Sequence, residues 1–203
     1  MSKKIIIVFE GIEGTGKSHH INNVAKFLKK KNKKFIQIRE PGGSKNSEKI
    51  RKLIFKKDSN FNCNTDLLLY LAARSENINL IKKNIGKKII LIDRFVDSTI
   101  AYQHYGMGIN IDLINNINKF LLKNIKINFT FLNLVSQKNM SLRLSKRKNL
   151  NRYDKFKYSF YKKIQNGFIK IQKKNPKKYM KINSDLNVSI NKKIIISKVK
   201  ELI

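Results

Sequence analysis

The segment KKIIIVFEGIEGTGKSHHINNVAKFL, residues 3–28, decides the fold. Its first part is a continuous apolar run that ends at Glu10, and such a run is typical of a strand buried on both faces. Three glycines follow, and apolar residues then recur at helical spacing from Ile21 to Leu28. The order of strand, glycine loop and helix predicts the first unit of an α/β fold.

The glycine loop, residues 11–18, matches GxxxxGK[ST] and lies where that pattern requires, between a strand and a helix. Glycines allow backbone N–H groups to turn towards phosphate oxygens, and the helix N-terminus adds positive potential. We expect Lys17 to reach the β- and γ-phosphates and Ser18 to ligate Mg²⁺. The nucleotide site is predicted to contain Gly11, Ile12, Glu13, Gly14, Thr15, Gly16, Lys17 and Ser18. GTPases, helicases, ATPases and small-molecule kinases share this loop, so it does not identify the reaction.

Further strands and helices alternate along the rest of the chain. Strands are predicted over 35–38, 87–94, 128–134 and 179–183. Helices are predicted over 65–85, with Asn64 as the N-cap, and over 98–105, 112–123, 136–148 and 154–174. This alternation predicts a P-loop NTPase-type three-layer α/β/α fold with a central five-stranded parallel sheet. No linker or repeat divides the sequence, so we expect residues 1–203 to form a single domain.

Basic residues dominate the composition. There are 45 Lys and Arg against 13 Asp and Glu, which gives a formal net charge of +32, and such a charge is typical of nucleic-acid-binding proteins. However, 38 of the 45 are lysines, and Asn and Ile are also abundant, as an AT-rich genome favours. We therefore attribute the charge mainly to that bias and expect no nucleic-acid partner. The hydrophobic fraction of 41% suits a folded core and excludes a disordered or fibrous protein.

Two further features predict a location. Cys63 is the one cysteine in the sequence, so no intrachain disulfide can form. The apolar run near the start is five residues long, too short for a signal peptide or a membrane span. We expect a cytoplasmic protein with no membrane partner.

The seven arginines carry more information than the lysines, because they resist the compositional bias. A guanidinium offers a planar fork that binds phosphate with two hydrogen bonds, whereas an ammonium is a point charge. The seven are Arg39, Arg51, Arg74, Arg94, Arg143, Arg147 and Arg152. A reaction between two phosphorylated substrates needs such cations to position both of them.

Four motifs at these separations carry a family resemblance: FEGIEGTGKS at 9–18, IREPGGS at 38–44, YLAAR at 70–74 and IDRFVDSTIAYQ at 92–103. Together they resemble the bacterial thymidylate kinases, and the similarity runs along nearly the whole chain. The resemblance implies transfer of the γ-phosphoryl group of ATP to dTMP, giving dTDP and ADP for dTTP biosynthesis. It also implies a Mg²⁺ cofactor and a homodimer.

The resemblance assigns the acceptor phosphate to the basic residues of these motifs. Arg94 grips the phosphate, assisted by Arg39, Glu40 and Arg51. Asp93 resembles the strand-end acid that, with Ser18, supports Mg²⁺.

The base and the sugar of the acceptor are assigned to a second group of residues. Tyr70 and Arg74 are four apart and share one helix face, so a ring can stack on the base while a guanidinium donates to a base carbonyl. The family usually has Phe at the Tyr70 position. The resemblance adds Ser98, Thr99 and Gln103 near the base, with Tyr102 and Glu13 at the deoxyribose.

A basic segment, about 141–154, resembles the lid that closes over ATP. Gly14 follows the loop acid Glu13, and in family members with glycine there the catalytic arginine comes from the lid. Arg147 and Arg143 are therefore the candidates, acting together with Lys17 and Arg94. Two residues after Arg152 this chain has Asp154, where the family favours Glu.

Two alternatives stay open at this point. A kinase for another nucleoside monophosphate would share the ATP loop and the phosphate grip, although Tyr70, Arg74, Ser98 and Gln103 favour thymine. A nucleic-acid-binding ATPase would use the +32 charge, and its DNA binding would weaken steeply with salt. The sequence contains no recognisable nucleic-acid-binding motif in support of it.

Overall fold

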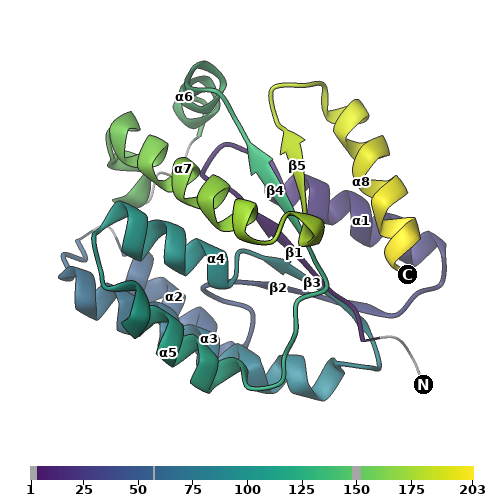
Figure 1. The fold of residues 1–203 in the computed structure, drawn as a ribbon, viewed down its shortest axis with the longest axis horizontal. Coiled ribbons are helices and arrows are strands. Elements are labelled where there is room, and N and C mark those ends of the chain that lie inside the picture. The colour runs from purple at the N-terminus through teal and green to yellow at the C-terminus, as the bar shows by residue number, and fades with distance from the viewer. Residues whose placement is uncertain (1–3, 57, 148–151) are drawn as a thin grey trace.

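The computed structural model describes residues 4–56, 58–147 and 152–203 (Figure 1). Its centre is a five-stranded sheet with the order β2-β3-β1-β4-β5, in which every neighbouring pair is parallel. The strands are β1 (Ile6–Glu10), β2 (Phe35–Arg39), β3 (Ile89–Asp93), β4 (Phe129–Leu134) and β5 (Tyr179–Asn183). All five lie where the sequence predicted strands, and the predicted fold class is confirmed.

Helices connect the strands and cover both faces of the sheet. The α-helices are α1 (Lys17–Lys30), α2 (Lys45–Phe55), α3 (Cys63–Asn84), α4 (Val96–Thr99), α5 (Ile111–Leu122), α6 (Gln137–Ser145), α7 (Tyr158–Lys174) and α8 (Val188–Leu202). A π-helix, η1 (Ile100–Gly106), continues α4, and two short 3₁₀ helices are η2 (Arg152–Lys155) and η3 (Pro176–Lys178).

The central strand explains the three layers. Side chains alternate across a strand, so Ile7 and Phe9 of β1 pack with α1 and α8 on one face, while Ile6 and Val8 pack with α3 on the other. Figure 1 shows α1 and α8 side by side on their face of the sheet. Every residue of β1 is buried, as its continuous apolar run predicts.

Several predicted helix boundaries were wrong. Helix α3 begins at Cys63, and its N-cap is Asn62 rather than Asn64, because the Asn62 side chain accepts a hydrogen bond from the N–H of Thr65 (2.9 Å). The helix predicted over 98–105 is divided into α4 and the π-helix η1. The helix predicted over 154–174 begins at Tyr158, after η2.

The predicted basic helix over 136–148 is also shorter in the structure. Helix α6 ends at Ser145, and residues 146–147 follow it without helical structure. The part of the predicted lid at 148–151 lies outside the described residues.

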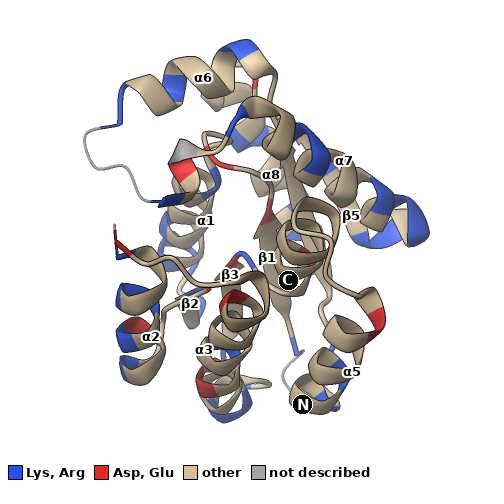
Figure 2. Ribbon diagram, turned by 90° about the vertical axis from the view of Figure 1, so that its left-hand side faces the viewer, with Lys and Arg blue, Asp and Glu red and all other residues tan. Residues whose placement is uncertain are grey.

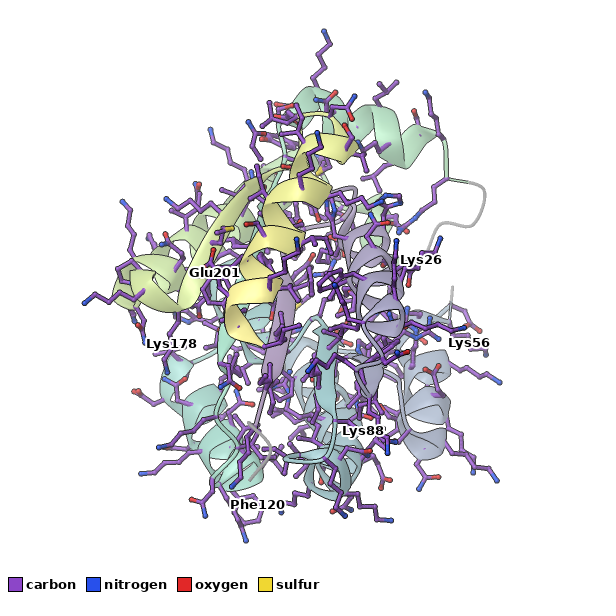
Figure 3. The ribbon with its side chains drawn as sticks, turned by 90° about the vertical axis from the view of Figure 1, so that its right-hand side faces the viewer. Lys26, Lys56, Lys88, Phe120, Lys178 and Glu201 are labelled. Carbon is purple, nitrogen blue, oxygen red and sulfur yellow. The ribbon has the colours of Figure 1, made fainter. Side chains whose placement is uncertain are left out.

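The charged side chains lie mainly on the outside of the molecule. Figure 2 shows Lys and Arg spread over α1, α2, α3, α5, α6 and α7 rather than gathered on one element. The side chains of Lys26 and Lys56 point outward in Figure 3. Within the described part of the chain, no helix is long and apolar enough to span a membrane.

Candidate active site

A cavity of about 440 Å³ lies beyond the carboxyl ends of β1, β2 and β3, where ligands bind in sheets of this kind. It brings together the phosphate-binding loop, the ends of β2 and β3, and one face each of α2, α3, α4 and η1. Seventeen of the nineteen residues predicted for the nucleotide, acceptor and metal sites line it: Glu13, Gly14, Thr15, Gly16, Lys17, Ser18, Arg39, Glu40, Arg51, Tyr70, Arg74, Asp93, Arg94, Ser98, Thr99, Tyr102 and Gln103. The two predicted lid arginines, Arg143 and Arg147, line it as well.

The two exceptions are Gly11 and Ile12, at the start of the loop, whose carbonyl groups accept hydrogen bonds from Lys17. The Lys17 ammonium donates to the carbonyl oxygens of Gly11 and Ile12 (2.8 Å each) and to the Thr15 hydroxyl (3.2 Å). Burial lowers the pKa of Lys17 to about 7, with a further contribution from the charge of Arg94. Gly16 has a left-handed backbone and directly precedes α1, so the loop turns into the helix N-terminus as the glycine pattern predicted.

Arg94 joins the phosphate-binding loop to the far side of the cavity. Its guanidinium donates to the Gly11 carbonyl (2.9 Å) and forms an ion pair with Glu13 (2.8 Å). The residue holds a left-handed backbone, with φ of 65°, which is costly for a side chain other than glycine and is found at functional sites. Glu13 also accepts a hydrogen bond from the Tyr102 hydroxyl. Burial alone would raise the pKa of Glu13, but Arg94 and Lys17 lower it, so the carboxylate is ionised.

Ser18 and Asp93 provide two adjacent oxygen groups beside the loop. The Ser18 hydroxyl donates to the Asp93 carboxylate (2.8 Å). Mg²⁺ prefers oxygen ligands and takes only one or two from the protein when substrate phosphates supply others, so this pair fits the ion. Among residues 4–56, 58–147 and 152–203, no group of three or more His, Cys, Asp or Glu side chains is arranged to hold a metal.

Arg74 lies deep in the wall of the cavity, inside a network of buried polar groups. It donates to Glu40 (2.8 Å), to Asn118 (2.7 Å), and to the carbonyl of Phe95 and the hydroxyl of Thr99 (2.9 and 2.8 Å). Its side chain is only 2% exposed. Burial raises the pKa of Glu40, although the charge of Arg74 opposes that shift. The network therefore fixes Arg74 through groups from three other parts of the chain: the end of β2, the start and end of α4, and α5.

The predicted base-contacting residues sit next to this network. Tyr70 lies one turn before Arg74 on α3, and both line the cavity, as the spacing of four predicted. Gln103 is 1% exposed, and its side-chain N–H₂ has no hydrogen-bond partner. Buried polar groups are nearly always paired, so this amide is suited to a ligand group in the cavity.

Arg39 and Arg51 occupy the more open side of the cavity. Arg39 is 56% exposed on its side chain and forms an ion pair with Glu48 (2.9 Å). Arg51 donates to the Pro41 carbonyl (2.6 Å), and its guanidinium lies 4.5 Å from the centre of the Phe55 ring. Both guanidiniums lie near the end of β2, and the sequence predicted both of them at the acceptor phosphate.

The two predicted lid arginines contact different parts of the site. Arg143 of α6 donates to the carbonyl of Gly14 (2.8 Å) and to that of Ser184 (2.7 Å), so it lies against the phosphate-binding loop. Arg147 pairs with Asp154 across the cavity rim (2.6 Å). Arg152 does not line the cavity and instead pairs with Asp66.

The sequence analysis missed a buried carboxyl pair behind the site. Glu10, at the end of β1, accepts hydrogen bonds from the N–H groups of Phe95 and Ser98 (2.8 and 3.2 Å) and from the Ser98 hydroxyl (2.5 Å). Burial and the neighbouring Asp97 raise the pKa of Glu10 to about 7. Asp97 accepts from the Tyr179 hydroxyl (2.8 Å), and burial raises its pKa to about 6. The position of Glu10 at the end of a buried strand was the one signal for this role.

Other residues of the site were also missing from the sequence analysis. Phe55 and Tyr153 line the cavity, and Asn118 of α5 supports Arg74 from behind. Their contacts join segments far apart in the sequence. No local pattern marks such residues.

Comparison with known proteins gives one consistent result. The family model described as thymidylate kinase matches residues 9–195. The thymidylate kinase of Sulfurihydrogenibium sp. (strain YO3AOP1) is 35% identical over 198 residues, which cover 96% of both chains. That of Thermosipho africanus (strain TCF52B) is 38% identical over 171 residues, or 83% of this chain and 85% of the relative. The crystal structure of thymidylate kinase from Ehrlichia chaffeensis superposes with a TM-score of 0.78 at 30% identity, covering 97% of this chain and 98% of the other.

Proposed function

The chain belongs to the thymidylate kinase family, and from that premise we propose how its residues bind ATP and dTMP. The enzyme is an ATP-dependent nucleoside monophosphate kinase that transfers the γ-phosphoryl group of ATP to dTMP, giving dTDP and ADP for dTTP biosynthesis. In this reaction an oxygen of the dTMP phosphate bonds to the γ-phosphorus, and the bond from that phosphorus to the oxygen bridging to the β-phosphorus breaks. The protein's contribution is to position the substrates and to neutralise charge.

The donor nucleotide is proposed to occupy the loop of residues 11–18. Backbone N–H groups at the start of α1 would donate to the phosphates, and Lys17 would exchange its contacts with loop carbonyls for phosphate oxygens. Ser18 and Asp93 would hold Mg²⁺. When bound, that ion would supply positive charge that offsets the negative charge of the donor phosphates.

The acceptor phosphate is proposed to bind at Arg94, with Arg39 and Arg51 on its open side. The observation that carries this assignment is the set of contacts from Arg94 to Glu13 and to the Gly11 carbonyl. These contacts hold one guanidinium beside the donor loop, so an anion bound to Arg94 lies next to the γ-phosphate position. Glu40 would act by holding Arg74 rather than by touching phosphate.

The nucleoside part of dTMP is proposed to lie between η1 and α3. Tyr70 would stack on thymine, while Arg74, Ser98, Thr99 and Gln103 face its polar edge. The unpartnered amide of Gln103 supports a hydrogen bond to the base. Tyr102 and Glu13, which are already hydrogen-bonded to each other, would contact the deoxyribose.

The catalytic arginine is proposed to come from the lid, predicted at about 141–154. Arg143 already lies against the donor loop through Gly14, and Arg147 stands at the rim in an ion pair with Asp154. Either guanidinium would stabilise negative charge on the transferring phosphoryl group.

We further propose a single domain that is cytoplasmic, forms a homodimer and has no nucleic-acid or membrane partner. Support for self-association comes from large apolar side chains exposed on neighbouring helices, namely Leu68 of α3, and Leu113 and Phe120 of α5.

The first experiment measures ADP release from ATP and Mg²⁺ with dTMP, dUMP, UMP, CMP or AMP as the acceptor, and with DNA in a parallel reaction. We expect the highest kcat/KM with dTMP and a loss on the order of 10³-fold in Arg94→Ala. Turnover that ignores dTMP and responds to DNA would refute the proposal. Lys56→Ala, an exposed lysine outside the cavity, is the matched control for loss of one positive charge.

A further inference from the structure

One face of α3 carries three side chains in successive turns, Asp66, Tyr70 and Arg74, of which Tyr70 and Arg74 line the cavity. The proposed function uses Tyr70 and Arg74 for the base but gives Asp66 no part. Asp66 is 3% exposed, and a buried carboxylate needs strong partners to offset the cost of leaving water. Its partners lie far away in the sequence.

Asp66 holds η2, the short helix near the end of the predicted lid segment. One carboxylate oxygen accepts from the Arg152 guanidinium, and the other accepts from the Tyr153 hydroxyl (2.6 Å). Burial and the negative charge of Asp66 raise the pKa of Tyr153, so the hydroxyl keeps its proton and is the donor.

Tyr153 forms part of the acceptor side of the cavity. It is 2% exposed, and its ring lies edge-on to those of Tyr70 and Tyr102, with centroids 6.2 and 6.1 Å away. The ring of Phe55 lies 5.8 Å away. The side chain held by Asp66 therefore packs against both aromatic residues assigned to the base and the sugar.

The next residue continues these contacts to a predicted catalytic group. Asp154 follows Tyr153 in η2 and accepts a hydrogen bond in its ion pair with Arg147 (2.6 Å). A series of short polar contacts thus leads from the acceptor-binding helix, through η2, to a lid arginine.

We propose that Asp66 and Tyr153 are positioning residues for phosphoryl transfer, which set the place of Arg147 from the helix that binds the acceptor base. This inference rests on the proposed function, because Arg147 acts only if ATP and dTMP meet in this cavity. Small displacements of a charged group reduce catalysis strongly, since its contribution depends on its distance from the reacting atoms. Asp66 and Tyr153 would therefore affect kcat without touching the phosphates.

The test compares Tyr153→Phe, Asp66→Asn and the double variant with the wild-type chain. Tyr153→Phe removes one hydroxyl and keeps the ring, and Asp66→Asn keeps the shape of the side chain. We expect kcat to fall about tenfold in each single variant, while KM for ATP stays within about twofold. The double variant should also lose about tenfold rather than a hundredfold. Asparagine offers one acceptor oxygen where Asp66 offers two, so both changes weaken the same set of contacts that holds η2 on α3.

A merely structural role predicts a different pattern, in which thermal stability falls and kcat measured well below the melting temperature does not. Tyr105→Phe, which removes a hydroxyl outside the cavity, is the matched control. Wild-type kcat in Tyr153→Phe, or losses that multiply in the double variant, would overturn the inference. If Asp66→Asn does not fold, kcat of Tyr153→Phe decides alone. Lack of dTMP turnover by the wild-type chain would instead refute the proposed function.

Discussion

The two halves of the cavity are held together in different ways. On the donor side, Lys17 is fixed by carbonyl groups five and six residues before it in the same loop. On the acceptor side, Arg74 is fixed by Glu40, Phe95, Thr99 and Asn118, which are 21 to 44 residues away. A short local sequence can specify the first arrangement, whereas the second exists only when four elements have packed. We therefore expect loss of a charged side chain on the donor side to affect chemistry, and loss of one on the acceptor side to affect chemistry and folding together.

The largest effect is expected from Lys17→Ala on the donor side. Loss of this ammonium should lower kcat/KM by on the order of 10³-fold with every acceptor, because the phosphates of ATP lose a buried positive charge. The free energy of unfolding should not fall. Burial of the charged ammonium is unfavourable, as the lowered pKa of Lys17 shows, so its removal takes away a destabilising group. Steady-state kinetics and thermal unfolding measure the two effects. Lys26→Ala, an exposed lysine on the same helix, is the control (Figure 3).

The acceptor-side counterpart is Arg74→Ala. This change would leave the Glu40 carboxylate buried without its ion-pair partner, which typically costs about 3–5 kcal/mol of the free energy of unfolding. KM for dTMP should rise as well. Chemical denaturation with an unchanged m-value would measure the loss. Lys56→Ala removes an exposed ion pair and should change stability by less than about 1 kcal/mol. A stable Arg74→Ala variant with altered KM alone would contradict the distinction between the two halves.

The same distinction explains what the sequence could predict. The phosphate-binding loop and the five strands follow from runs of adjacent residues, so their places were predicted closely. Resemblance also located Arg74 and Gln103 at the cavity, but it could not show that four buried groups hold Arg74. Asn118 and Asp66 carry no local signal of their partners, and Glu10 carries only its position at the end of a buried strand. Their roles depend on which helices pack together, and side-chain periodicity does not specify that.

A smaller effect is expected for two glycines of the donor loop, which should differ in how much stability they lose when replaced by alanine. A Cβ on Gly11 would lie 2.2 Å from the backbone oxygen of Asn133, at a φ of +135° that disfavours side chains, whereas a Cβ on Gly16 has no neighbour within 4 Å. Gly11→Ala should therefore lower the free energy of unfolding by about 2–3 kcal/mol, because β4 must shift. Gly16→Ala should lower it by about 1 kcal/mol, from its left-handed backbone alone. Equal losses in thermal unfolding would show that the loop is not constrained by β4.

The last expected effect is a pH dependence of stability, which arises at Glu10, between the two halves. The carboxyl group faces Asp97, Ser98 and Arg94, and its pKa of about 7 in the folded chain lies above the ordinary value of 4.5. Below about pH 4.5 both folded and unfolded chains hold the proton. As the pH rises towards 7, the unfolded chain releases it first, so this group destabilises the fold progressively. Above about pH 7 the destabilisation is complete.

Glu10→Gln should remove this pH-dependent destabilisation, because glutamine does not titrate. Its side-chain oxygen can still accept a hydrogen bond from the N–H of Phe95. We expect the melting temperature of the wild-type chain to fall relative to that of Glu10→Gln as the pH rises from 5 to 7, and the difference to level off above 7. Lys17 has the opposite effect, because its lowered pKa makes the fold more stable as the pH rises above 7. The comparison below pH 7 therefore excludes Lys17, while Asp97, whose pKa is also raised, to about 6, is present in both chains. Glu201→Gln, an exposed carboxyl group, should follow the wild-type curve (Figure 3). Parallel curves for Glu10→Gln and the wild-type chain would mean that Glu10 is ionised throughout, held by Arg94 and the N–H groups at the start of α4.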